Sequence, residues 1–221
     1  MKKLILLLLL VMTPSLFASG QHNVNKSVDV KAEKYYKQLT QLNDKQFVIL
    51  VKSIKHGEKY NKGEKLGAIA WRESNLGKFV ANPKEGKYGT YGVYQSTIEA
   101  ALDRHNMKHT LANVKKMRQL LLNDLTFAAN DALTELKYWE SRYKNKKNKD
   151  KIVLASYNAG TKGIKSSKAL AYADDVMLRT KVINKYVEQN KQYITARYNT
   201  IVAKEYTKLA LTVLTPTSLI A

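Results

Sequence analysis

The chain lacks cysteine, and it has few of the residues that interrupt helices. None of its 221 residues is Cys, three are Pro and ten are Gly. Without cysteine there can be no disulfide and no anchor through an acylated cysteine, so the fold has to be stabilised by packing. No run of alternating apolar residues is long enough to predict more than a short strand. The sequence therefore predicts a mainly α protein.

Acidic residues are scarce as well. There are 18 Asp and Glu against 38 Lys and Arg, which gives a formal charge of +20 at pH 7. Such a surface attracts polyanions. We find no nucleic-acid-binding motif, so we expect no nucleic acid partner but peripheral contact with an anionic envelope polymer or membrane surface. A lysine coat that only keeps the protein soluble is the alternative.

The one apolar run at the N-terminus has the order of a secretory signal peptide. Residues 1–3 are basic, residues 4–12 are apolar, and residues 14–19 supply the small residues of a cleavage site. The run is shorter than the roughly 20 residues of a membrane-spanning helix, which disfavours the alternative of an uncleaved anchor. We therefore predict a signal peptide at 1–19, cut after Ala18 or Ser19, and export to the periplasm or cell envelope. Loss of its two lysines lowers the formal charge from +20 to +18.

The mature chain is predicted to have three parts. Residues 20–60 would be a polar lead-in, disordered at 21–30, followed by a helical extension. Residues 61–190 would form the main domain, and residues 191–221 a helix tucked against the core with a loose tail. Apolar periodicity predicts helices over 31–54 (one long or two short), 64–77, 96–106, 111–143 with a break near 123–124, 152–156, and 166–214.

Glycine is concentrated in one stretch of the chain. Half of the ten glycines fall between residues 67 and 92, which predicts a turn-rich loop or a short hairpin there. The segment that follows, Ser96-Thr-Ile-Glu99, has the pattern of a capping box and predicts that a helix starts at Ser96.

Glu73 occupies a position on the apolar face of a predicted helix. Leu66, Ile69 and Ala70 stand at i, i+3 and i+4, and Glu73 follows at i+7. Burial would raise the pKa of its carboxyl above the roughly 4.3 of a free Glu. A general acid that works near neutral pH requires this shift. The alternative is a carboxylate at a frayed helix end that reaches solvent or pairs with Arg72 or Lys78.

Three short segments follow one another in a characteristic order. Glu73-Ser74 ends a helix, Gly92-Val-Tyr-Gln95 follows the glycine-rich stretch, and Ala155-Ser-Tyr-Asn-Ala-Gly160 closes a later helix. This order resembles the lysozyme-like domain of the soluble lytic transglycosylases, whose motifs read Glu-Ser, Gly-Leu-Met-Gln and Ala-Tyr-Asn-Ala-Gly, with a tyrosine in a later helix. The likeness covers about residues 60–190 and implies a lysozyme-like fold of the goose type. Val-Tyr in place of Leu-Met is a departure that affects the shape of the groove.

The resemblance implies a role for each matching residue. Glu73 would be the sole catalytic acid and base. The substrate-binding residues would be Asn82, Tyr94, Gln95, Tyr157, Asn158 and Tyr186. Among them, Tyr157 would hydrogen-bond the catalytic carboxyl and Tyr186 would be the late tyrosine. Ordinary alternatives stay open: a surface amide for Gln95, a helix end for Tyr157-Asn158, and a core aromatic for Tyr186.

The resemblance also implies the reaction. Many glycosidases use two carboxylates, but the motifs supply only Glu73. The acetamido oxygen of N-acetylmuramic acid would replace the second group, and the C6 hydroxyl of that sugar would close a 1,6-anhydro ring. No metal or organic cofactor would be needed. Several small members of this family clear peptidoglycan for conjugation, secretion or pilus machinery, which suggests such a machine as a partner.

Other functions remain open at this point. A goose-type muramidase would hydrolyse the same bond with water and a second carboxylate, for which Glu85 in the glycine-rich stretch is the candidate. A non-catalytic protein would bind peptidoglycan in the same groove without cleaving it. His105 and His109 stand one helical turn apart, as a metal-binding pair can, but no third ligand is near them in the sequence.

Overall fold

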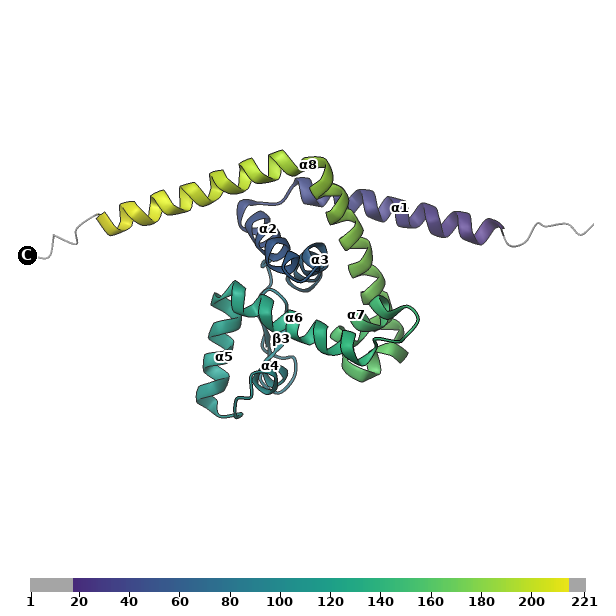
Figure 1. Ribbon diagram of the computed structural model, residues 1–221, viewed down its shortest axis with the longest axis horizontal. Helices are drawn as coiled ribbons and strands as arrows, with labels where there is room; N and C mark the ends of the chain where they lie inside the picture. The colour runs from purple at the N-terminus through teal and green to yellow at the C-terminus, as the bar shows by residue number, and fades with distance from the viewer. Residues whose placement is uncertain (1–17, 215–221) are drawn as a thin grey trace, which may run out of the picture.

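The computed structural model describes the backbone of residues 18–214 and the side chains of residues 27–210 (Figure 1). Within this part the chain is mainly helical with one small antiparallel sheet. The predicted fold class, helices with a short hairpin in the glycine-rich stretch, is confirmed at this level. The predicted signal peptide falls almost wholly in residues 1–17, outside the described residues, as does the last part of the predicted tail.

The elements follow in this order: α1 (Ala18–Thr40), α2 (Asp44–Glu58), α3 (Gly63–Ser74), β1 (Ala81–Asn82), β2 (Thr90–Tyr91), β3 (Ser96–Thr97), α4 (Ile98–Arg104), α5 (Leu111–Asn123), α6 (Leu125–Arg142), α7 (Lys149–Ala159), the 3-10 helix η1 (Gly160–Lys165) and α8 (Ser167–Leu214). The region 31–54 thus forms parts of two helices, one of the two alternatives that its periodicity allows.

Helix α3 lies between α2 and α8 (Figure 1). Its apolar face is completely enclosed, with Leu66, Ile69 and Ala70 each 0% exposed, so the predicted face is confirmed. The helix ends at Ser74 and not at Gly77, because Asn75 and Leu76 already have left-handed backbone with φ of 50° and 55°. Glu73 therefore lies in the last turn of α3.

The sheet is a three-stranded antiparallel meander, β1-β2-β3, in which Asn82 pairs with Thr90 and Thr90 with Thr97. Strand β2 contacts α5, and β3 contacts α4 and α6. The predicted helix start at Ser96 is wrong, because Ser96 lies in β3 and α4 begins at Ile98. The side chain of Glu99 does not complete a capping box, since its carboxylate accepts a hydrogen bond from the backbone N–H of Lys87 at 3.3 Å.

Helices α5 and α6 share one apolar stripe with a break between them, as predicted. Asp124 separates them, and its carboxylate accepts a hydrogen bond from the backbone N–H of Phe127 at 2.9 Å, which caps the N-terminus of α6. The buried members of the stripe are Val114, Met117, Leu121, Ala128, Ala132 and Leu136.

Helix α1 contains residues 21–30, so the prediction of a disordered lead-in is wrong. The second half of α1 is fixed to the core through Tyr35 and Leu39, which are 7% and 0% exposed. The Tyr35 hydroxyl also donates a hydrogen bond to Asp175 in α8. Residues 21–40 contain no Gly or Pro. Once one end is fixed, extending a helix costs little per residue.

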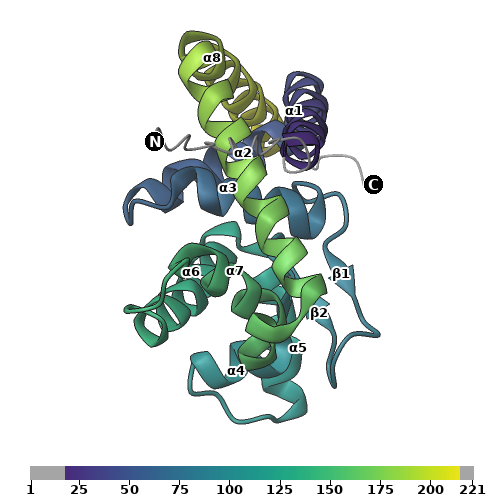
Figure 2. The ribbon, with the colours of Figure 1, turned by 90° about the vertical axis from the view of Figure 1, so that its right-hand side faces the viewer.

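Helix α8 runs from α7 past α3 to α1 and then bends (Figure 2). The bend is at Asn190, whose φ of −126° and ψ of 21° are not helical. After it, Arg197 pairs with Asp44 of α2 at 2.9 Å, and Ile201 is 8% exposed. Beyond Ile201 the helix projects away from the core (Figure 1), so the predicted C-terminal helix is tucked against the core only in its first part. None of the described helices has the length and apolar character that crossing a membrane requires.

Candidate active site

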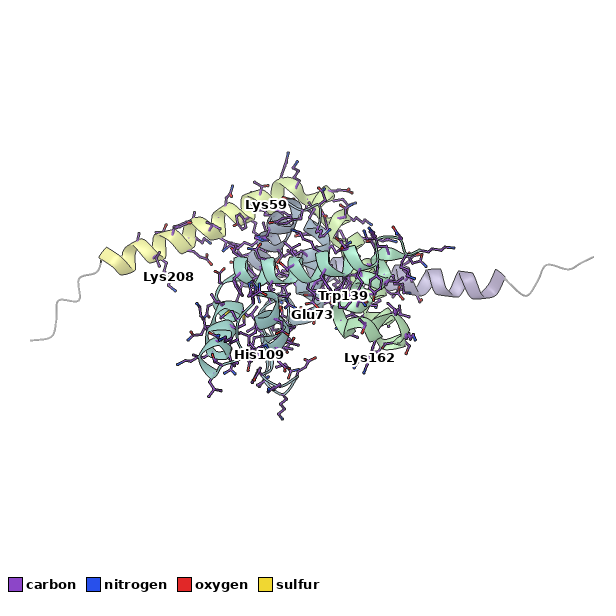
Figure 3. The ribbon with its side chains drawn as sticks, turned by 60° about the horizontal axis from the view of Figure 1, so that its bottom comes forward. Lys59, Glu73, His109, Trp139, Lys162 and Lys208 are labelled. Carbon is purple, nitrogen blue, oxygen red and sulfur yellow. The ribbon has the colours of Figure 1, made fainter. Side chains whose placement is uncertain are left out.

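A cleft of about 250 Å³ opens beside the C-terminal end of α3. Its walls come from α3, the small sheet, α6 and α7, so it joins segments that are far apart in the sequence. The lining residues are Glu73, Asn82, Glu85, Thr90, Gln95, Ser96, Thr97, Glu135, Tyr157 and Asn158. All three segments of the sequence motif therefore contribute to one cleft, with Glu73 near the centre of the molecule (Figure 3).

Glu73 is partly buried and faces this cleft. Loss of water around its carboxyl raises the pKa from 4.5 to about 7, which outweighs the lowering by the hydrogen bond from Tyr172 and by the charge of Arg72. The negative charges of Glu85 and Glu135 raise it further. The carboxyl therefore keeps its proton to a much higher pH than a free Glu does, and it is not the freely solvated carboxylate of the alternative.

Tyr172 is the hydrogen-bond partner of Glu73. Its hydroxyl lies 2.5 Å from Oε1 of Glu73 and donates to it across α8 and α3. The side chain is 5% exposed, and burial together with the nearby charge of Glu73 raises its pKa well above the ordinary value. Tyr172 therefore keeps its proton and remains a donor. None of the sequence motifs indicates Tyr172 as a residue of the site.

Tyr186, predicted to be the late tyrosine of the cleft, is instead a core residue. It is 1% exposed and packs edge-on against Tyr36 of α1, with ring centroids 5.8 Å apart. It lies 14 residues beyond Tyr172 on α8, which is about 21 Å along a helix. The part of α8 that passes the cleft therefore carries Tyr172 and not Tyr186.

Tyr94, predicted to contact substrate, also belongs to the core. It is 1% exposed, and its hydroxyl lies 2.8 Å from Oγ of Ser53 in α2. Gly92 and Gln95 on either side have left-handed backbone, with φ of 86° and 50°. This tight turn directs Tyr94 inward and leaves Gln95 at the cleft.

Tyr157 and Asn158 line the cleft at the end of α7, as their motif predicts. The expected hydrogen bond from Tyr157 to the catalytic carboxyl is absent from the described contacts, because the Tyr157 hydroxyl donates to the backbone carbonyl of Tyr94 at 3.4 Å. Burial raises the pKa of Tyr157 well above its usual value, and the charges of Glu135 and Glu73 raise it further. Tyr157 thus lies close to the acid and joins α7 to the turn that carries Gln95.

The amides of Gln95 and Asn82 build the opposite wall. Gln95 donates through Nε2 to the carbonyls of Phe79 and Gly92, at 3.0 and 3.1 Å. Its Oε1 accepts from the Thr90 hydroxyl at 3.1 Å. Asn82 donates through Nδ2 to Oε2 of Glu85 at 2.9 Å. These bonds hold the strand ends together, and they place amide groups and the Glu85 carboxylate at the edge of the cleft.

Glu135 is a third carboxyl group in the cleft and was not foreseen from the sequence. Its Oε2 accepts from Nη1 of Arg104 at 3.0 Å. Burial raises its pKa, while the charge of Arg104 and a hydrogen bond from Trp139 lower it. Arg104 also binds Asp131, which is 0% exposed, through two hydrogen bonds of 2.8 and 2.6 Å. No sequence motif indicates Glu135, since it stands in the long helix α6 beside the buried Leu136.

Comparison of the chain with protein-family models, curated proteins and solved structures finds no match. The chemistry of the cleft therefore has to be argued from its own groups.

His105 and His109, the pair with metal-ligand spacing, contact different acidic side chains. His105 stacks on Phe127 with ring centroids 4.7 Å apart and lies 3.2 Å from Oδ1 of Asp131. His109 lies 2.8 Å from Oδ1 of Asp103. Within the described side chains, no three potential ligands come together as a metal site would require.

Proposed function

We propose that the chain is an exported peptidoglycan lytic transglycosylase, with a lysozyme-like domain over about residues 61–190. It would cleave the β-1,4 bond between N-acetylmuramic acid and N-acetylglucosamine and serve wall remodelling or the assembly of an envelope-spanning machine. The observation that carries the proposal is Glu73, a carboxyl with a pKa of about 7 in a polar cleft. The order of the motifs supports it, because all three meet at that cleft.

In the first step the protonated Glu73 donates its proton to the glycosidic oxygen. The acetamido oxygen of the muramic sugar attacks its own anomeric carbon and the leaving oxygen departs with the proton. Tyr172 fixes the orientation of the Glu73 carboxyl and stabilises the carboxylate that this step creates. The amides of Asn82, Gln95 and Asn158 supply groups at the cleft that can hydrogen-bond acetamido and hydroxyl groups.

In the second step the ionised Glu73 accepts the proton of the C6 hydroxyl of the same sugar. The C6 oxygen then attacks the anomeric carbon and displaces the acetamido oxygen, which closes the 1,6-anhydro ring and returns Glu73 to its protonated form. A carboxyl with a pKa of about 7 suits both steps, since near neutral pH it can donate and accept a proton at similar cost. The scheme uses no metal and no organic cofactor.

Mass spectrometry of sacculi digested with the purified chain tests this function. We expect released muropeptides that end in the anhydro sugar, and no release by Glu73→Gln. The matched control is Glu58→Gln, which removes one exposed carboxylate from α2 and should leave release unchanged. If Glu73→Gln digests sacculi as fast as the unmodified chain, Glu73 is not the acid and the proposal fails.

A second candidate function, hydrolysis by a goose-type muramidase, is favoured by one observation: Glu85 lines the same cleft as Glu73. A second carboxylate in the cleft could activate water, as in glycosidases with two acidic groups. The two functions give products that differ by one water molecule. The muramidase would be the better assignment if the products carry a reducing end and if Glu85→Gln abolishes their release.

A further inference from the structure

One face of α2 carries a row of lysines that lines a groove away from the cleft. Lys52, Lys55 and Lys59 stand at i, i+3 and i+7, which places them on the same side of the helix. Together with His56 they line a groove of about 610 Å³ whose other wall is the junction of α5 and α6. We call these three lysines the α2 basic face.

The lysines of the α2 basic face carry positive charge that no ion pair within the described residues neutralises. Among the described side chains, none of the three lysines forms an ion pair, whereas lysines such as Lys62 and Lys151 do. The groove contains one acid, Asp124, whose carboxylate caps the N-terminus of α6. Like charges at this spacing repel one another, so an anion in the groove would lower the free energy of the face.

An exposed apolar strip adjoins the α2 basic face. A second groove, of about 330 Å³, contains Lys52 and side chains from the part of α8 that follows the bend: Tyr198, Val202, Glu205, Tyr206 and Leu209. Tyr206 and Leu209 are 70% and 65% exposed. The two surfaces are continuous, because the Lys55 ammonium lies 4.1 Å from the centre of the Tyr198 ring.

We propose that the α2 basic face and the apolar strip of α8 dock the protein on an anionic phospholipid surface. The lysines would contact headgroup phosphates, while Tyr206 and Leu209 would enter the boundary between headgroups and acyl chains. A soluble polyanion would use the lysines and leave the apolar side chains in water. Lipid uses both, and tyrosine is typical of the interfacial layer. This is why we favour a lipid surface.

The docking surface is separate from the cleft. It consists of α2, the start of α6 and the end of α8, whereas the cleft is lined from α3, the sheet, the middle of α6 and α7. In Figure 3, Lys59 and Lys208 lie on the α2 and α8 side of the molecule and Glu73 lies nearer its centre. A protein docked in this way keeps the cleft open, so the inference does not depend on the proposed enzymatic function.

Co-sedimentation with vesicles tests the charged part of the surface. The purified chain is mixed with vesicles of phosphatidylcholine alone, or with one third phosphatidylglycerol, and the ratio of the two partition constants is compared between variants. All variants share residues 1–17, so any contribution of that segment to vesicle binding is the same in each and does not affect the comparison. Lys52→Gln/Lys55→Gln/Lys59→Gln should lower the ratio on the order of a hundredfold, because each basic residue near an anionic surface contributes about fivefold.

The control removes the same charge elsewhere. Lys144→Gln/Lys146→Gln/Lys147→Gln changes three exposed lysines of the α6–α7 loop, and it should leave the ratio close to that of the unmodified chain. If the two triple variants lower the ratio equally, net charge alone attracts the protein to lipid, and the proposal that the α2 basic face binds it is refuted. The same conclusion follows if neither variant changes the ratio.

A third variant tests the apolar strip. Tyr206→Ser/Leu209→Ser changes two exposed side chains, so the fold should be retained, which circular dichroism checks. We expect weaker binding to the phosphatidylglycerol vesicles, and the loss should persist at raised salt, where charge contributes less. If this variant binds as well as the unmodified chain and soluble polyphosphate displaces the vesicles completely, the surface binds soluble polyanions and the lipid proposal is overturned.

Discussion

Tyr172 donates a hydrogen bond to Oε1 of Glu73 over 2.5 Å, although 99 positions in the sequence separate the two residues. The bond joins the end of α3 to the first turns of α8 across the enclosed side of the cleft. It acts on Glu73 in the opposite direction to burial: desolvation raises the pKa of the carboxyl, and the Tyr172 hydroxyl lowers it by stabilising the ionised form. The value of about 7 is the balance of these opposing effects.

Tyr172→Phe should shift the pH dependence of cleavage upward. Without the hydroxyl the pKa of Glu73 rises, so the acid stays protonated to higher pH and the alkaline limb of kcat/KM moves to higher pH. The rate at the optimum should fall about tenfold, since a hydrogen bond to a charged group contributes about 1.5 kcal/mol. The pH profile of sacculus digestion measures both effects. A lower rate with an unshifted limb would mean that Tyr172 only supports the fold.

Glu73→Gln should make the protein more stable at neutral and alkaline pH. Because the folded-state pKa is raised from 4.5 to about 7, the folded chain binds the proton more tightly than the unfolded chain. The free energy of unfolding therefore falls by on the order of 3 kcal/mol as the pH rises from about 4.5 to about 7. Above about pH 7 this contribution is constant.

Urea unfolding of both chains at pH 4 and pH 8 measures this effect. The stability difference between Glu73→Gln and the unmodified chain should be larger at pH 8, in favour of the variant. Glu58→Gln, on the exposed face of α2, should show no such pH-dependent gain. An equal difference at both pH values would mean that Glu73 has an ordinary pKa.

Local sequence pattern was sufficient to predict most of the helices and part of the lining of the cleft. The stripe at Leu66, Ile69 and Ala70 predicted the buried face of α3. Residues of the motifs, such as Gln95 and Asn158, do line the cleft. These inferences depend on periodicity and on short segments, in which neighbours in the sequence are also neighbours in space.

The errors concern contacts between distant elements. Nothing near Tyr172 or Tyr186 in the sequence indicates which of them lies beside the end of α3. The answer depends on how far α3 and α8 overlap, which is set by tertiary packing. Tyr94 points inward because Gly92 and Gln95 have left-handed backbone. A glutamine rarely adopts this conformation, so the turn could not be predicted from the sequence. Glu135 reaches the cleft through the packing of α6, which its periodicity alone does not specify.

Arg104→Gln should destabilise the fold strongly. Arg104 neutralises Asp131, which is 0% exposed, and also binds Glu135 of the cleft. Removing one partner of a buried ion pair leaves the other charge uncompensated, which costs about 3–5 kcal/mol. Thermal unfolding at pH 7 measures the loss. Arg104→Met combined with Asp131→Leu removes both charges of the buried pair. It leaves only the partly exposed Glu135 without its arginine and should recover much of the stability. If the double variant is no more stable than Arg104→Gln, the unpaired charge is not the cause.

Gly92→Ala should distort the wall of the cleft as well as destabilise the protein. Gly92 has a φ of +86°, and a Cβ there would lie 2.5 Å from the backbone oxygen of Leu121 in α5. That oxygen belongs to a helix and cannot move aside easily, so the turn that carries Gln95 has to shift. Gly160→Ala is the matched control, because Gly160 also has a positive φ, of +61°, but nothing lies within 4 Å of its Cβ.

Both glycine variants place an alanine at a positive φ, which costs on the order of 1–3 kcal/mol in backbone strain. Only Gly92→Ala adds the clash, so its unfolding midpoint should fall further than that of Gly160→Ala. Its KM for peptidoglycan should also rise, since Gln95 and its hydrogen bond to Thr90 move with the turn. Equal midpoints and equal KM values for the two variants would show that α5 yields to the new methyl group and that the turn tolerates it.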